Sequence, residues 1–347
     1  MAVLFADPGG EYYYSSGISA PGVWSATSGA SLINNAAAGA LTTYAISLSG
    51  SGSVTKYLAA NYVTLIVGGR IYWPSSVTAT YNLITVTDGA TAQAELSQDA
   101  SGHLTVTRNG TVLGTSTLAL VTGSGWHYIE FVITIGPASA GSPNGSAQVY
   151  VDNVQWLNLT GVNTKNSSNQ YVNRVSWSRV SSGVNTNWKD MVIIETTGGT
   201  ITTRQGDVQV SAVYPNAAGV NQQFSNTGGA TQTASVQDGR SHSGTWPDGD
   251  TSYISDSVSG HISDFAHDTL SAGSILAVVH VSYARSDVGT ANFEQVALSA
   301  GTQHTSASIA VGGTYNYFFD VMEVDPHTSS AWTVSNFNSA TFGVAIP

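Results

Sequence analysis

The sequence contains no cysteine, which excludes disulfide bonds, thiolate catalysis and zinc–thiolate sites. Charged residues make up only 9% of its 347 residues, and the formal net charge is −11. Because the lysines and arginines form no cluster that could neutralise phosphates, we predict no nucleic-acid partner. Apolar runs fall short of the ~18 residues of a membrane-spanning helix, so we predict no membrane partner either.

The N-terminus lacks the features of a secretory signal. Residues 1–10 have no basic region and too short an apolar run for a signal peptide. We therefore expect synthesis in a host cytoplasm without classical export. Glycine, serine, threonine, alanine and asparagine take the place of charged residues, as is common in all-β proteins outside a cytosol or in large assemblies. This combination favours localisation in a virion that is released by lysis.

Alternating hydrophobicity between residues 125 and 154 predicts a long β-hairpin, the feature around which the first half of the chain is organised. Its two runs are separated by a loop rich in proline and glycine at residues 137–145. Since a lone hairpin is barely stable in water, a second sheet must cover it. The residues expected to face that second sheet are Ile129, Phe131, Ile133, Val149, Val151 and Val154.

Further strands follow from the same alternation, and no helix of useful length is visible in the first half. Asn109–Gly110 predicts a tight hairpin turn, and Gly68–Gly69 predicts a bulge or tight turn. We predict an all-β protein of two β-sandwich or jelly-roll domains in tandem, residues 1–200 and 206–347. Strands are expected at residues 42–48, 62–73, 81–87, 92–97, 103–107, 173–180, 188–195, 207–213, 274–283, 293–298, 307–311, 315–324 and 341–346, with a surface loop at 216–244.

Two motifs in the first half resemble a known fold. The strand Trp126-His127-Tyr128-Ile129-Glu130-Phe131 is followed by a loop and by Val149-Tyr150-Val151-Asp152-Asn153. Together with the run Trp188–Ile194 they resemble the laminin-G/concanavalin-A-like jelly roll over roughly residues 1–200. The resemblance implies the fold and says nothing about the ligand.

The second half resembles a module of tailed-bacteriophage structural proteins. The motifs that carry this resemblance lie in residues 206–210, 247–253, 325–328, 331–333 and 342–344, and they span almost the whole second domain in the expected order. The resemblance implies a virion component.

The function predicted on this basis is a virion structural protein on the capsid or tail surface, as a decoration, fibre or tail-associated part. Its expected partners are other virion proteins and copies of itself, with a trimer as the first choice among closed symmetries. The jelly roll would also contact a host-surface glycan. Two alternatives stay open: a stand-alone carbohydrate-binding lectin or adhesin, and a glycoside hydrolase-like enzyme.

The acidic residues argue against the enzyme alternative. Glycoside hydrolysis needs two carboxyl groups about 5 Å apart for retention. Concanavalin-A-like enzymes often carry them on one strand as Glu-x-Asp-x-x-Glu. No two strand carboxylates in the first domain have that spacing, and we therefore predict that the chain is not an enzyme. These carboxylates are Glu95, Glu130, Asp152, Asp190 and Glu195.

Exposed aromatic rings are the candidates for glycan or partner contact, because they stack on the apolar face of a sugar. The alternative is that such rings fill the core of a sandwich. We predict no catalytic residue, and we interpret His127 as a packed residue beside Trp126. The candidate binding residues are Tyr12, Tyr13, Tyr14, Trp24, Tyr72 and Trp73.

Three aspartates could form a calcium loop. Asp248 and Asp250 flank a glycine and Asp256 follows closely, and carboxylate oxygens suit Ca²⁺. The other acidic positions of an EF-hand are missing. The favoured interpretation is a turn in which these aspartates accept backbone hydrogen bonds, so we predict no cofactor.

Overall fold

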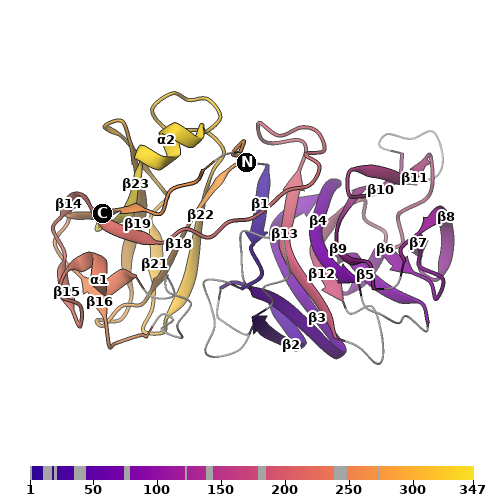
Figure 1. The fold of residues 1–347 in the computed structure, drawn as a ribbon, viewed down its shortest axis with the longest axis horizontal. Coiled ribbons are helices and arrows are strands. Elements are labelled where there is room, and N and C mark those ends of the chain that lie inside the picture. Colours follow the sequence, from indigo (N-terminus) through magenta and orange to yellow (C-terminus); the bar gives the residue numbers. More distant parts are fainter. Residues whose placement is uncertain are drawn as a thin grey trace. The chain divides into compact units, whose positions relative to one another are not determined.

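The structure is a computed structural model that describes residues 2–10, 18, 22–34, 44–73, 79–121, 123–137, 144–178, 185–237, 248–271 and 273–347. The chain forms two compact units (Figure 1). Unit 1 comprises Met1–Ser19 and Trp24–Ser211, and unit 2 comprises Ala20–Val23 and Ala212–Pro347. The predicted all-β class, with two sandwich or jelly-roll units in tandem, is confirmed.

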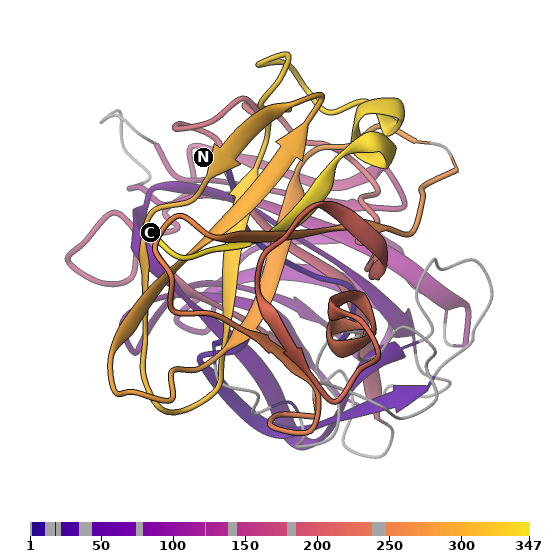
Figure 2. The same ribbon diagram turned by 90° about the vertical axis from the view of Figure 1, so that its left-hand side faces the viewer.

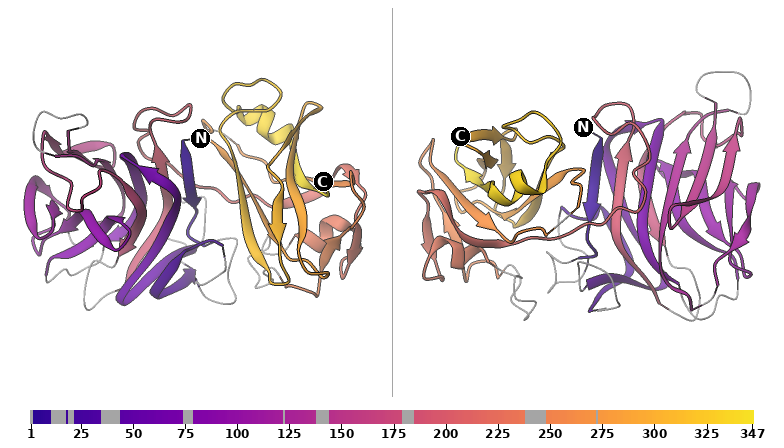
Figure 3. Two further views of the ribbon diagram at one scale, coloured as in Figure 1. Left: turned by 180° about the vertical axis from the view of Figure 1, so that it is seen from behind. Right: turned by 45° about the horizontal axis from the view of Figure 1, so that its top comes forward.

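The described residues of unit 1 form thirteen strands in one antiparallel sheet. Their order is β11-β10-β9-β4-β13-β3-β12-β5-β6-β7-β8, with β1 beside β13 and β2 beside β3. Figure 3 shows these strands from two further sides. The strands are β1 (Val3–Asp7), β2 (Ala26–Asn34), β3 (Tyr44–Tyr62), β4 (Thr64–Trp73), β5 (Tyr81–Asp88), β6 (Thr91–Gln98), β7 (His103–Arg108), β8 (Thr111–Ala119), β9 (Gly125–Thr134), β10 (Ser146–Val151), β11 (Val154–Thr160), β12 (Val172–Ser178) and β13 (Thr186–Glu195).

This sheet folds over on itself into two layers. The first layer runs from β11 to β13 with β1, and the second runs from β3 to β8 with β2. The layers meet in the core: a Cβ atom at Gly69 of β4 would lie 3.2 Å from the Trp177 Nε1 atom of β12. Trp177 is fully buried, as are the inward residues of both layers. Burial of apolar side chains between the layers therefore holds unit 1 together.

The central hairpin is confirmed. Strand β9 pairs with β10, and Phe131 lies opposite Val149, both of them completely buried. The prediction for Val154 is wrong, since its side chain is 55% exposed. The chain turns at Asp152–Asn153, both with positive φ, and Val154 begins β11 on the outside.

Asn109–Gly110 forms the predicted turn between β7 and β8, with φ of 48° and 76°. Gly68–Gly69 does not form a bulge, because β4 pairs with β9 without interruption. The irregularity lies in the neighbouring β13, whose register against β4 shifts between Lys189 and Val192. Gly68 is needed for space instead: a Cβ atom there would lie 2.2 Å from the hydroxyl oxygen of Tyr128.

Residues 201–211 are not part of any strand, although a strand was predicted at 207–213. The register of the sheet leaves no pairing for this segment, and it crosses unit 1 as irregular backbone. Its polar contacts are described below.

Unit 2 contains a six-stranded sheet of order β14-β17-β23-β19-β20 with β21 beside β19, and two separate strand pairs, β15-β16 and β18-β22. Figure 2 faces this unit. Its helices are short, and no helix in the described ranges is long and apolar enough to span a membrane. The elements are β14 (Pro215–Gln222), β15 (Ser225–Thr227), α1 (Gln232–Val236), β16 (Tyr253–Ser255), β17 (Ile262–His267), β18 (Val278–Ala284), β19 (Ala291–Ser299), β20 (Thr302–Thr305), β21 (Ile309–Val311), β22 (Asn316–Met322), α2 (Val334–Ser339) and β23 (Thr341–Ala345).

The predicted surface loop at residues 216–244 is only partly a loop, because it contains most of β14 and all of β15 and α1. Its residues 238–244 lie outside the described residues. Thr333 is the N-cap of helix α2, and its hydroxyl accepts a hydrogen bond from the Asn336 N–H. Phe337 of α2 packs on Trp332 and Val278 in the core of the unit.

Candidate functional site

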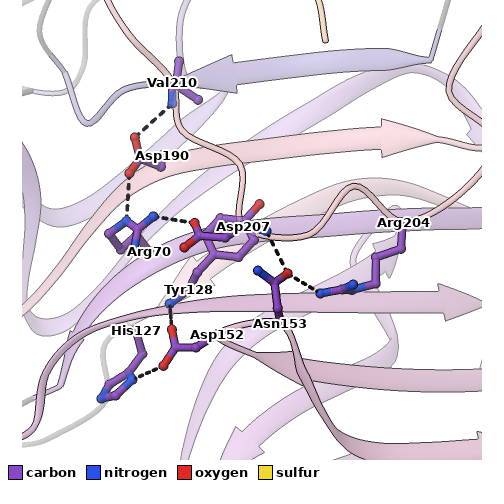
Figure 4. A network of polar contacts seen from close by, with 9 residues as sticks. All are labelled: Arg70, His127, Tyr128, Asp152, Asn153, Asp190, Arg204, Asp207 and Val210. Atoms are coloured by element: carbon purple, nitrogen blue, oxygen red, sulfur yellow. Dashed lines mark hydrogen bonds and ion pairs between the residues drawn. The ribbon is translucent and has the colours of Figure 1, made fainter. Parts of the chain in front are cut away.

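Residues 201–211, which we call the strap, run across the outer side of the first layer of unit 1 (Figure 4). At its start Arg204 pairs with the carboxylate of Glu130 and donates from Nη2 to Asn153 Oδ1 at 2.7 Å. Asn153 Oδ1 also accepts the N–H of Asp207 at 3.0 Å. One side chain from the β10–β11 turn therefore holds the strap at two points.

The other end of the strap is held by an ion-pair network. Arg70 of β4 lies between two carboxylates: its Nε atom is 3.0 Å from Asp190 Oδ2, and its Nη2 atom pairs with Asp207. The second oxygen of Asp190 accepts the N–H of Val210 at 3.1 Å. Asp190 can take this position because β13 is irregular there, with φ of 52° at Asp190.

The strap buries the groups beneath it. Tyr128 and Glu130 point outward from β9, yet each is only 1% exposed. Burial raises the pKa of Glu130, and Arg204 opposes this rise. Burial also raises the pKa of Asp190, against the hydrogen bond from Val210 and the charge of Arg70. These groups pair with one another, so the network fixes the strap to the sheet.

The outer side of the second layer differs in character, since it carries partly exposed polar residues. A row of polar residues crosses five neighbouring strands in register, because each residue lies directly opposite the next. Each alternates with residues buried in the core. We call this row, together with Arg174 and Tyr57 beside it, the threonine face. The row consists of Thr55, Ser176, Thr85, Glu95 and Thr107.

Hydrogen bonds fix these side chains. Thr55 Oγ1 and Ser176 Oγ are 2.8 Å apart. The two oxygens of Glu95 accept from Asn82 Nδ2 at 2.8 Å and from Thr107 Oγ1 at 3.2 Å. Each hydroxyl and carboxylate oxygen in such a row has further capacity for hydrogen bonds to a ligand.

Arg174 and Tyr57 lie beside this row. They are directly opposite each other in the β12–β3 register, and the Arg174 guanidinium carbon is 4.2 Å from the Tyr57 ring centroid. The Tyr57 side chain is 45% exposed. No carboxylate in the described part of the chain pairs with Arg174. The face therefore offers a partly exposed ring and a cation that no carboxylate of the described residues pairs with.

Of the predicted aromatic candidates, the three that the structure describes form no exposed cluster. Tyr12, Tyr13 and Tyr14 lie outside the described residues. Trp24 and Trp73 are core residues, 6% and 0% exposed, and present no ring face to a sugar. Tyr72 is partly exposed on the first layer, where its ring packs edge-on against Trp126 with centroids 5.5 Å apart. Tyr57, which lies in a stretch of β3 that sequence patterning does not predict as strand, was missed.

The three candidate calcium ligands are engaged separately. Asp248 accepts the N–H and the hydroxyl of Ser252. Asp250 pairs with Arg285, while Asp256 accepts two backbone N–H groups and contacts His261 Nδ1 at 2.7 Å. No group of three His, Cys, Asp or Glu side chains within the described ranges is placed to hold a metal ion.

Comparison with known proteins gives distant structural similarities. No family model matches the chain, and no curated protein matches it. An endo-β-1,4-glucuronan lyase from the fungus Trichoderma reesei is 14% identical, with a TM-score of 0.39, over 56% of this chain and 95% of that chain. Alginate lyase vAL-1 from Chlorella virus is 11% identical, with a TM-score of 0.36, over 50% and 93%. The binding domain of Paraclostridial Mosquitocidal Protein 1 is 12% identical, with a TM-score of 0.38, over 56% and 48%.

These similarities correct two predictions. The predicted virion structural role is contradicted, because the similar structures named above are polysaccharide lyases and a binding domain. The prediction that the chain is not an enzyme is contradicted by the same lyases. With TM-scores below 0.5 the similarities carry no argument for a particular activity. The function has to be inferred from the geometry of this chain.

Proposed function

We propose that unit 1 is a carbohydrate-binding module that holds a polysaccharide across its threonine face. The observation that carries this proposal is the row of five polar side chains in register on five strands, with Arg174 and the exposed Tyr57 beside it. Neighbouring strands are about 4.8 Å apart, so the row extends about 19 Å. A row of that length matches several consecutive sugar residues of a polymer.

The chemistry of the face suits a sugar. Hydroxyl, amide and carboxylate groups on rigid strands can exchange hydrogen bonds with sugar hydroxyls without ordering a loop. Arg174 lies over one face of the Tyr57 ring, and the exposed remainder of the ring supplies an apolar surface for a pyranose, since Tyr57 is 45% exposed. The Arg174 guanidinium has donors to offer because no described carboxylate occupies it.

The test measures binding of the full chain to a panel of neutral and acidic polysaccharides, by glycan array and then by calorimetry. We expect Tyr57→Ala to weaken binding about tenfold, since the loss of one stacking contact of about 1.4 kcal/mol has that effect. Thr55→Val should weaken it about fivefold through the loss of one hydrogen bond of about 1 kcal/mol.

Thr64→Val is the matched control for Thr55→Val. Thr64 also forms a hydroxyl pair across two strands, with Thr134 at 3.0 Å, but it lies in the first layer of unit 1. Its replacement should leave the affinity unchanged. Binding to no polysaccharide of the panel, or equal losses for Thr55→Val and Thr64→Val, would contradict the proposal.

A further inference from the structure

Three side chains near the start of β9 form a continuous hydrogen-bonded chain. The Ser124 Oγ atom is 2.7 Å from His127 Nε2, and His127 Nδ1 is 2.6 Å from Asp152 Oδ2. His127 was predicted to pack beside Trp126, but it bridges these two polar residues. The order hydroxyl, imidazole, carboxylate is that of a nucleophile, its base and the group that orients the base.

The backbone holds these residues in place. Asp152 lies in the two-residue turn between β10 and β11, and Figure 4 shows its carboxylate between His127 and the backbone of Tyr128. Its Oδ1 atom accepts the Tyr128 N–H at 2.9 Å, and its own N–H donates to the Tyr128 carbonyl at 2.9 Å. Ser124 is held by its N–H, which donates to Val121 O at 3.1 Å. Both ends of the chain are therefore anchored to backbone.

The hydrogen bonds determine which ring nitrogen of His127 carries a proton and which can accept one. When His127 donates its Nδ1–H to Asp152, Nε2 is left to accept the hydroxyl proton of Ser124. The His127 side chain is 18% exposed and that of Asp152 48%. Ser124 is exposed as well, so an incoming molecule can reach its oxygen. Gly125 adds space beside it, because a Cβ atom there would have no neighbour within 4 Å.

Other histidine–aspartate pairs in the described ranges lack the third member. His103–Asp99, His261–Asp256 and His304–Asp320 are each within hydrogen-bonding distance. In none of them is the other ring nitrogen bonded to a serine or threonine hydroxyl of the described residues. The arrangement at Ser124 is therefore more than the pairing of a surface histidine with an acid.

We propose that Ser124 is a nucleophile that cleaves small carboxylic esters, with His127 as general base and Asp152 as the residue that positions the imidazole. Ser124 Oγ attacks the ester carbonyl carbon while its proton moves to His127 Nε2. The bond from the carbonyl carbon to the alcohol oxygen breaks, and the alcohol leaves with the proton from Nε2. Water then attacks the acyl-serine with His127 as base, which releases the acid and restores the Ser124 hydroxyl.

An ester of a short acyl group fits this position. A long acyl chain needs an apolar pocket, whereas Ser124 lies at the surface beside Gly125. The Ser124 N–H is already donated to Val121 O, so it is not available to an oxyanion. Since oxyanion donors supply much of the rate in such enzymes, turnover should be slow. The acyl-serine should accumulate with an activated ester such as p-nitrophenyl acetate, because its good leaving group speeds acylation and not deacylation. Covalent labelling is therefore the sensitive measurement.

The test incubates the full chain with p-nitrophenyl acetate and with a fluorophosphonate, follows the burst of p-nitrophenol, and locates the adduct by peptide mass spectrometry. We expect the adduct on Ser124, its loss in Ser124→Ala, and labelling at least about 100-fold slower in His127→Gln. His103→Gln is the matched control, since it removes a histidine from a histidine–aspartate pair without a serine. It should label at the rate of the unaltered protein.

Asp152→Asn tests the positioning role. Asparagine tolerates positive φ, such as the 48° found here, so the turn can be kept. We expect slower labelling, an unchanged unfolding midpoint, and a shift of the His127 Nδ1–H resonance in the proton NMR spectrum. An adduct elsewhere than on Ser124, no adduct at all, or equal labelling rates for His127→Gln and the unaltered protein would overturn the proposal. None of these results depends on polysaccharide binding.

Discussion

The ion pair between Arg70 and Asp190 allows a quantitative test of how the strap is held. Their side chains are only 14% and 4% exposed, and Asp207, the second partner of Arg70, is 32% exposed. Arg70→Leu would leave Asp190 buried without the guanidinium that pairs with it, while Asp207 can be solvated. Removing one partner of a buried pair costs about 3–5 kcal/mol, and we expect the free energy of unfolding of unit 1 to fall by that amount at neutral pH.

The loss should depend on pH in a defined direction. Burial already raises the pKa of Asp190 above its ordinary value of 3.8, and removal of Arg70 raises it further. A carboxyl group whose pKa is raised in the folded state favours folding in its protonated form. The deficit of Arg70→Leu is therefore largest above the raised pKa of Asp190, and it shrinks as the pH falls toward 3.8.

A double variant separates the buried charge from the lost packing. Asp190→Asn removes the charge, tolerates the positive φ, and keeps an oxygen for the Val210 N–H. Added to Arg70→Leu, it should recover about 2 kcal/mol. The control Arg174→Leu removes an arginine that has no described carboxylate partner, and it should cost less than about 1 kcal/mol.

Tryptophan fluorescence during urea unfolding is a suitable assay, because unit 1 holds Trp24, Trp73, Trp126, Trp156, Trp177 and Trp188, six of the eight tryptophans. An unfolding free energy of Arg70→Leu within about 1 kcal/mol of that of the unaltered protein, or a double variant no more stable than the single one, would refute the buried-charge explanation.

Three further predictions concern stability. The Nδ1 atom of His280 is buried without a partner among the described residues, and burial lowers the pKa to about 4 from 6.5, against the charge of Asp320. Unit 2 should therefore lose roughly 3 kcal/mol as the pH falls from 6.5 to 4, and His280→Gln should abolish this loss in urea titrations at each pH. Gly343→Ala would place a Cβ atom 2.0 Å from a backbone oxygen of β17, and should cost more than about 3 kcal/mol in thermal unfolding, whereas Gly312→Ala, with open space around it, should cost less than about 0.5. Asp7→Ala leaves two backbone N–H groups without their acceptor, and urea unfolding should show a loss of about 2 kcal/mol or more.

Period-two alternation predicted the strands whose two sides differ in polarity. It succeeded at β9 and β10, where one side meets the core. It failed for β3, which is 19 residues long although only residues 42–48 were predicted. The early part of β3 pairs with β13 and the later part with β12, so the strand passes from one layer to the other. The change of surroundings, with Ser49–Ser51 exposed between the two parts, breaks the alternation.

The strap shows a second limit. Val208 and Val210 alternate with polar residues as in a strand, yet the N–H groups of Asp207 and Val210 are bonded to side chains of Asn153 and Asp190. Those partners are 54 and 20 residues away, respectively. Local patterning cannot tell a backbone that pairs with a strand from one held by distant side chains.

The candidate sites were missed for a related reason. Alternation predicts which residues face outward, but strand register decides which of them become neighbours. Thr55 and Ser176 are 121 residues apart in the sequence and 2.8 Å apart in the fold. The pair Ser124 and His127 left a local signal, a serine between two glycines three residues before a histidine, but nothing nearby identified Asp152 as the third member.

The assignment of Ala20–Val23 to unit 2 affects how this protein can be divided. Val23 is completely buried, and the backbone of Tyr317 leaves Gly22 no room for a side chain. A fragment that starts at Ala212 would lack this short piece and expose the surface it covers. Gene fusions, truncations and domain exchanges that treat residue 212 as a clean border should therefore yield a weakened second half, and a graft that supplies residues 20–23 should restore it.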